Sequence, residues 1–227
     1  MICQIYSLKN GAHAKEVAQA GADYIGVNPT PKNSGMTKEE AFRTAKEVFD
    51  AIDEFGTTKV ALSIDCTFEE QKEIIETLHP DVLHICGNND DATPELVKAL
   101  KEVDPHLRIE QAIAMSGPEA IDKAIRMSEF CDLLILDSVA KDVIGVGAAG
   151  ITHDWNWDVE IVAKAKCPVI VAGGLGPENV EEVVRKVRSF GVDSLTKTNV
   201  PGTSLKDIDK VREFCRIAHE TAKELGI

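Results

Sequence analysis

The sequence predicts a single-domain (β/α)8 barrel over residues 1–227, and three observations support this fold class. Short apolar runs alternate with amphipathic segments along the whole chain, which is typical of repeated βα units around a parallel sheet. The length of 227 residues suits one barrel. Hydrophobic residues make up 44% of the chain and aromatic residues 5%, so an aliphatic core is expected. An open doubly wound sheet is the alternative, but the sequence shows no second domain and no reversal of connectivity.

The expected strands are segments of four to six residues, most of them apolar and rich in Val, Ile and Leu. Runs without polar alternation indicate strands that are buried on both faces. The eight runs are 2–5, 24–27, 59–64, 82–86, 108–113, 133–137, 169–172 and 194–198.

The expected helices are the amphipathic segments between these runs, and several carry start signals. Thr37 precedes Glu39 and Glu40, and Pro177 precedes Glu178, both typical of a first helical turn. The eight segments are 12–20, 38–55, 67–78, 94–103, 118–130, 158–166, 177–190 and 205–225. Three helix-to-strand junctions also share a pattern in which Asp23, Asp81 or Asp193 follows a turn at the base of the next strand.

Charge and cysteine content limit the partners and the compartment. A formal net charge of −13 argues against nucleic acid or an anionic membrane as partners. No segment is apolar enough to span a bilayer and no signal-peptide pattern is present, so a cytoplasmic protein is expected, as a monomer or homodimer. The six cysteines contain no C-x-x-C pair, so the sequence predicts reduced thiols and no metal site.

Three apolar strands break off at a small or reactive residue, namely Cys3, Asp137 and Gly173. In parallel barrels the carboxyl ends of the strands carry the chemistry, so these residues are expected to converge on one rim. Cysteine in a buried strand is often only a hydrophobe. An aspartate that closes a five-residue apolar strand must instead be solvated, paired or functional.

A phosphate site is expected in the turn after the seventh strand. Gly173-Gly174 there precedes a helix start at Pro177, and glycines with a helix N-terminus suit an anion. The G-x-G-x-x-G at 145–150 lies in a long loop rather than directly after a strand, so a dinucleotide site is rejected. Lys197 is expected to point into the barrel mouth, where it could bind an anion or form a Schiff base. The alternative is that it pairs with a structural acid.

These residues resemble phosphoribosylanthranilate isomerase, a (β/α)8 enzyme of tryptophan biosynthesis, over nearly the whole chain. The matching stretches are 2–4 with K-I-C-G, 21–27 with G-A-D-x-x-G-F, 134–138 with L-L-L-D-T, 147–155 with G-G-T-G-x-T-F-D-W, and 172–180 with A-G-G-L-x-P-E-N-V. The last of these is the most specific.

The resemblance implies an Amadori rearrangement with Cys3 as general base and Asp137 as general acid, and no cofactor. It implies a phosphorylated small-molecule substrate. The residues expected to bind phosphate are Gly147, Gly173, Gly174, Thr196 and Lys197. The expected substrate contacts are Asn28, Lys32, His84, Cys86 and Lys197.

Departures from the family pattern concern the residues that hold the anthranilate carboxylate. The second-loop motif S-P-R-x-V aligns with 33–37, which contains no arginine, and the strand-five arginine aligns with Ala114. The sequence therefore predicts an isomerase of a phosphorylated sugar or sugar-amine. Alternatives are a Schiff-base aldolase or lyase that uses Lys197, and a non-catalytic barrel that binds a phosphorylated ligand.

Overall fold

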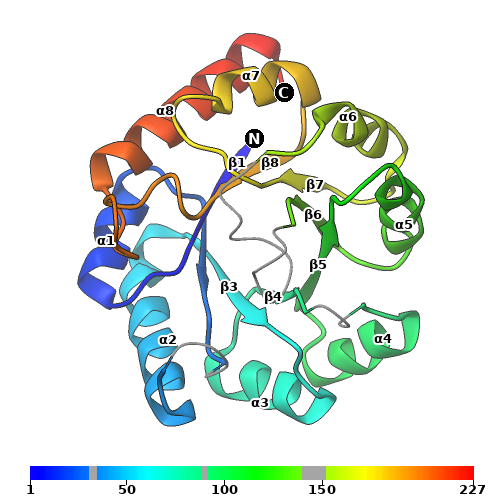
Figure 1. Cartoon of the computed structure of the whole chain (residues 1–227). Coiled ribbons are helices and arrows are strands. Elements are labelled where there is room, and N and C mark those ends of the chain that lie inside the picture. Colours follow the sequence, from blue (N-terminus) through cyan, green and yellow to red (C-terminus); the bar gives the residue numbers. More distant parts are fainter. Residues whose placement is uncertain (31–34, 88–90, 140–151) are drawn as a thin grey trace.

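The structure is a computed structural model that describes residues 1–30, 35–87, 91–139 and 152–227. Eight parallel strands close into a barrel in the order β1-β2-β3-β4-β5-β6-β7-β8. Figure 1 looks into the barrel, with the helices arranged around the strands. The predicted (β/α)8 fold is confirmed.

Strands and helices alternate from β1 onward, as the sequence pattern predicts. The strands are β1 Ile2–Tyr6, β2 Tyr24–Val27, β3 Thr58–Ser63, β4 Val82–Ile85, β5 Arg108–Ala114, β6 Leu133–Asp137, β7 Val169–Val171 and β8 Gly191–Ser194. The helices are α1 Gly11–Gln19, α2 Lys38–Ile52, α3 Phe68–Leu78, α4 Pro94–Val103, α5 Glu119–Met127, α6 Trp155–Lys164, α7 Val180–Val187 and α8 Ile208–Leu225, with a 3-10 turn η1 Asp53–Phe55. In the described part of the chain, no helix has the length and apolar character needed to cross a membrane.

Alternation along each strand separates two apolar layers. Cys3, Ile5 and their counterparts on the other strands pack against the helices in the main core. Tyr6, Val60 and Leu133 belong instead to a cluster that fills the barrel interior. Since successive side chains of a strand point to opposite faces, this alternation fixes which residues can reach the mouth.

Side chains at the junctions satisfy backbone groups that would otherwise be unpaired. Thr37 begins α2 with a capping box that includes Glu40, as its sequence predicts. Asp23 and Asp81, at the bases of β2 and β4, each accept a backbone N–H from the preceding strand, from Cys3 and Lys59 respectively. Asp132 does the same for Ile109. These aspartates hold the amino-terminal pole of the barrel together.

The eighth strand differs from its prediction. It spans Gly191–Ser194 rather than 194–198, and its first residue pairs with Ile2 of β1. Asp193 therefore lies within the strand and not at its base. The residue is 5% exposed. Unlike Asp23 and Asp81 at the other two junctions, Asp193 is therefore a buried acid of the barrel.

Candidate active site

Asp137 lies at the carboxyl end of β6 and faces the barrel interior. Ile135, two residues earlier, packs in the interior cluster with Ile170 and Ala172, and the strand alternation brings Asp137 to the same face. The Asp137 carboxylate accepts the Ser138 backbone N–H at 2.7 Å. Burial raises the Asp137 pKa to about 7, so this carboxyl can give or take a proton near neutral pH.

Cys3 lies at the other end of the barrel and points away from its interior. Its Sγ lies 4.0 Å from the backbone carbonyl oxygen of Cys215 on α8, and the residue is fully buried in the helix-facing core. Burial raises the pKa of the Cys3 thiol well above its usual value. The prediction that Cys3 shares the mouth with Asp137 is wrong, because alternation along β1 turns Gln4 and Tyr6 inward and Cys3 outward.

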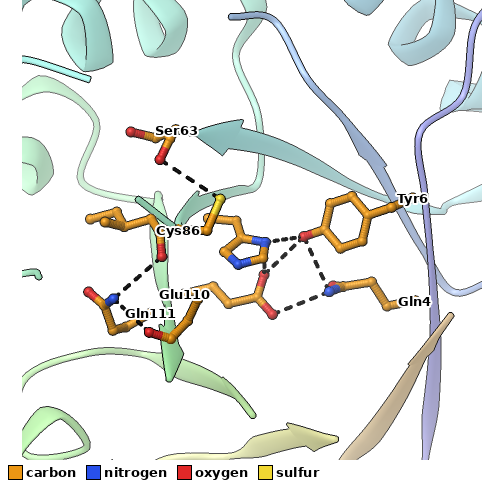
Figure 2. Close-up of polar contacts among 9 residues, drawn as sticks. Gln4, Tyr6, Ser63, Cys86, Glu110 and Gln111 are labelled. Atoms are coloured by element: carbon orange, nitrogen blue, oxygen red, sulfur yellow. Dashed lines mark hydrogen bonds and ion pairs between the residues drawn. The ribbon is translucent and has the colours of Figure 1, made fainter. Parts of the chain in front are cut away.

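A polar cluster occupies the barrel interior below the mouth. The sequence predicted His84 as a site residue but not Gln4, Tyr6 or Glu110. Figure 2 shows Gln4, Tyr6 and Glu110 converging from β1 and β5. The Tyr6 hydroxyl lies 2.5 Å from His84 Nδ1 and 3.5 Å from Glu110 Oε2, and Gln4 Nε2 donates to Glu110 Oε1 at 3.3 Å. Ionisable and hydrogen-bonding side chains therefore line the barrel along its axis as well as at its rim.

Burial controls the protonation of this interior cluster. It lowers the His84 pKa to about 3 and raises that of Glu110 to about 7. His84 Nδ1 lies 3.7 Å from Glu110 Oε2, but a neutral imidazole makes this a polar contact and not an ion pair. Burial also raises the Tyr6 pKa well above its usual value, so the phenol is a hydrogen-bond donor.

Asp193 on β8 connects the interior cluster with Asp137. The register pairs Leu136 with Val171 and Val171 with Val192. One residue further along, Asp137 and Asp193 therefore flank the small side chain of Ala172. Burial raises the Asp193 pKa well above its usual value, and the charges of Asp137 and Glu110 raise it further.

The buried lysine near this site is Lys206 and not Lys197. Lys197 has a side chain that is 42% exposed and lies 3.5 Å from Glu178 Oε1, so the prediction that it points into the mouth is wrong. Lys206 is 3% exposed, and its Nζ donates to the Leu195 carbonyl oxygen at 2.5 Å and to Asn199 Oδ1 at 2.8 Å. Desolvation lowers the Lys206 pKa to about 8.

The glycine turn after β7 lies directly against the end of β6. Gly173 and Gly174 have φ angles of 86° and 62°. A Cβ on Gly173 would come within 2.2 Å of Ser138 Oγ, so only glycine allows this approach. Asn179 closes the turn by accepting the Gly176 N–H at 2.9 Å and donating to the Gly174 carbonyl at 3.1 Å.

The remaining predicted site residues are dispersed. Asn28 Oδ1 accepts hydrogen bonds from the backbone N–H and the hydroxyl of Thr30, so it shapes its own loop. Cys86 is buried at the top of the interior and its Sγ lies 3.9 Å from the Ser63 carbonyl oxygen. Thr196 lines a surface cavity of about 580 Å³ beside Lys197. Lys32 and Gly147 lie outside the described residues.

A hydrogen-bonded chain supports the loop that carries Asp137. Ser138 Oγ lies 2.9 Å from His153 Nδ1, and His153 Nε2 lies 2.8 Å from Asp158 Oδ1 on α6. All three side chains are buried or nearly so. Ser138 also lies beneath Gly173, so this chain holds the end of β6 in place and is shielded from solvent.

The fold and these residues define a (β/α)8 enzyme with acidic groups at the carboxyl ends of its strands. A family model described as N-(5'-phosphoribosyl)anthranilate (PRA) isomerase matches residues 3–216. The chain belongs to this family, whose members are aldose–ketose isomerases, and it is an enzyme of that class.

Individual relatives agree with this assignment. N-(5'-phosphoribosyl)anthranilate isomerase of Bradyrhizobium sp. strain ORS 278 is 33% identical over 214 residues, which cover 92% of this chain and 90% of the relative. A monomeric form of the dimeric Thermotoga maritima enzyme superposes with a TM-score of 0.77 at 21% identity, covering 97% and 100% of the two chains. A phosphoribosylanthranilate isomerase in complex with reduced 1-(o-carboxyphenylamino)-1-deoxyribulose 5-phosphate gives 0.76 at 21% identity, with the same coverage.

Proposed function

We propose that the protein catalyses an Amadori-type aldose–ketose isomerisation of a phosphorylated sugar or sugar-amine, with Asp137 as one of two proton-transfer groups. The observation that carries this proposal is the Asp137 carboxyl, which ends β6 on the interior face and has a pKa raised by burial to about 7. A carboxyl of that pKa is matched to acid–base work at neutral pH.

Asp193 is proposed as the second proton-transfer group, in place of Cys3. Asp137 and Asp193 flank Ala172, and the charge of Asp137 adds to burial in raising the Asp193 pKa. With two such acids in the mouth, one carboxyl can hold a proton as the acid while the other is ionised as the base. This is the division of work that the rearrangement needs.

The reaction then proceeds with balanced protons and no external oxidant. The acid donates a proton to the ring oxygen, and the C1–O bond breaks to give an open-chain iminium ion or protonated carbonyl group. The base removes the C2 proton, whose electron pair forms the C1–C2 double bond of an enaminol or enediol. Protonation at C1 and loss of the C2 hydroxyl proton give the ketose.

The substrate's phosphate is proposed to bind at the turn of Gly173 and Gly174. Both glycines have positive φ, and the turn leads into α7, whose N-terminal amides favour an anion. Lys206 lies near Asp193 and adds positive charge on the β8 side. Thr196 and Lys197 are too exposed to enclose a phosphate, so they are assigned at most its outer edge.

The substrate named for the relatives carries an aromatic carboxylate, and this chain lacks the matching cations. Ala114 ends β5 where the family pattern has arginine, and Gly35, Met36 and Thr37 offer none on the second loop. A buried bidentate arginine contact contributes on the order of 1.5–3 kcal/mol. We therefore propose that the preferred substrate lacks the benzoate group.

The alternatives are less well supported. A Schiff-base mechanism through Lys197 requires an interior amine, whereas this side chain is exposed and faces Glu178. A non-catalytic binding barrel would not need two acids with raised pKa values beside the glycine turn.

The test is turnover in D2O with a panel of phosphorylated aldoses, their aryl- and alkylamine adducts, and phosphoribosylanthranilate. The proposal predicts a ketose product with deuterium at C1, formed by the wild type and by Asp122→Asn on the surface of α5, but not by Asp137→Asn. Absence of deuterated ketose from every substrate would overturn it.

A further inference from the structure

A second cluster of chemically reactive side chains lies at the amino-terminal pole, at the opposite end of the barrel from Asp137. Cys3 of β1, Asp23 at the base of β2 and His219 of α8 bring a sulfur, an oxygen and a nitrogen within 4.8 Å of one another. The three residues are 20 and 196 positions apart in the chain, so only the closure of the barrel brings them together.

The contacts within this cluster converge on the Asp23 carboxylate. Asp23 Oδ2 lies 2.8 Å from His219 Nε2 and accepts the Cys3 backbone N–H at 2.7 Å. Cys215, which lies four residues before His219 and so on the same face of α8, also contacts the Cys3 thiol. Cys3 is fully buried, while the side chains of Asp23 and His219 are 40% and 37% exposed. The cluster is therefore closed off from solvent at Cys3 and open to solvent at Asp23 and His219.

We propose that Cys3, Asp23 and His219 form a zinc site that links the first strand to the last helix. Thiolate, imidazole and carboxylate are the ligands of protein-bound zinc, whereas calcium and magnesium select oxygen donors. Zinc bonds of about 2.0–2.3 Å place tetrahedral ligand atoms roughly 3.3–3.8 Å apart. The cluster needs only small side-chain shifts to reach that spacing. The solvent-facing side, beside Asp23 and His219, leaves a fourth position for water.

The site has a defined physical consequence. A metal bound to the folded chain alone would stabilise the barrel at the point where β1 meets α8. Binding must displace the thiol proton of Cys3, so affinity is expected to increase with pH. Neither effect involves the mouth, and the proposal does not depend on the proposed isomerase activity.

The experiment is titration of metal-free, reduced full-length protein with Zn²⁺ by calorimetry and with Co²⁺ by absorption spectroscopy. We expect one ion per chain and a sulfur-to-cobalt charge-transfer band. His219→Gln should weaken binding by at least about a hundredfold and Cys3→Ala should remove the charge-transfer band. At about a hundredfold excess of Zn²⁺ over Kd, the wild-type Tm should rise by about 5–10 °C.

Two control variants make the test specific. Cys131→Ala removes another buried thiol that neighbours an acid, and His106→Gln removes an exposed imidazole; both should bind zinc like the wild type. Because His219 is partly exposed, its variant should fold with an unchanged metal-free Tm. The proposal is overturned if the wild type binds no zinc, or if His219→Gln and the control variants bind it equally.

Discussion

The sector of the barrel formed by β6, β7 and β8 differs from the sector formed by β1 to β5 in how closely it follows the family pattern. The first sector keeps Asp137 and the glycine turn, and the turn packs directly on the end of β6. The second carries Tyr6, His84 and Glu110 in its interior, and Ala114 at its rim. Under the proposed function, the first sector would carry proton transfer and phosphate binding, and the second would recognise the remaining part of the substrate.

Asp137→Asn should have the largest effect, because the amide cannot exchange the proton that the rearrangement requires. We expect kcat/KM to fall by about a thousandfold without loss of folding, measured with the substrate identified in D2O. Asp122→Asn is the matched control. A fall of less than tenfold would show that the Asp137 carboxyl is not required for proton transfer.

Glu110→Gln should change how stability depends on pH. The Glu110 pKa is about 7 in the folded protein and about 4.3 when unfolded, so the folded state holds the extra proton between those values. Stability is therefore lost as pH rises through this window. At pH 8 the substitution should raise the free energy of unfolding by on the order of 3 kcal/mol, with little change at pH 4.

Denaturant titrations at several pH values test this prediction. Glu119→Gln at the exposed start of α5 should leave the pH dependence as it is in the wild type. An unchanged slope for Glu110→Gln would mean that the interior carboxyl is ionised in the folded barrel.

Substrate preference should show a smaller effect. A phosphorylated substrate without the benzoate group should be turned over at least about tenfold more efficiently than phosphoribosylanthranilate, since the loss of a charged hydrogen bond is worth about 1.5 kcal/mol or more. Assays with purified protein measure the ratio. Growth of an isomerase auxotroph without tryptophan, together with kcat/KM of about 10⁴ M⁻¹s⁻¹ or more on phosphoribosylanthranilate, would contradict it.

Tyr6→Phe should have the smallest effect. It removes the hydroxyl that contacts His84 Nδ1 and Glu110 and leaves both groups buried, at a cost of about 1–2 kcal/mol in stability. Thermal unfolding should show a Tm that is lower by a few degrees. A loss of activity as large as that of Asp137→Asn would instead place Tyr6 among the catalytic residues.

The sequence was sufficient to predict the barrel, because the spacing of apolar residues along strands and helices shows which segments are buried and on which faces. It was also sufficient to place Asp137 at the end of a strand, where a charged residue closes an apolar run. It failed for Cys3, because the sequence of β1 alone did not show that Gln4 and Tyr6 face the interior and Cys3 faces the helices. Asp193 was misplaced because its Gly-Val-Asp context resembles a strand base. The Cys3, Asp23 and His219 cluster has no sequence signal, because its members meet only through closure of the barrel.

The pH dependence of kcat/KM for the wild type and Asp193→Asn tests the central claim most directly. If one of the two carboxyls, Asp137 or Asp193, is protonated while the other is ionised, the wild type should give a bell-shaped profile whose two limbs belong to the pair. Asp193→Asn should lose one limb and most of its activity, since a single remaining carboxyl cannot be acid and base at once. An unchanged bell in the variant would contradict the account and would place the second proton-transfer group elsewhere in the chain.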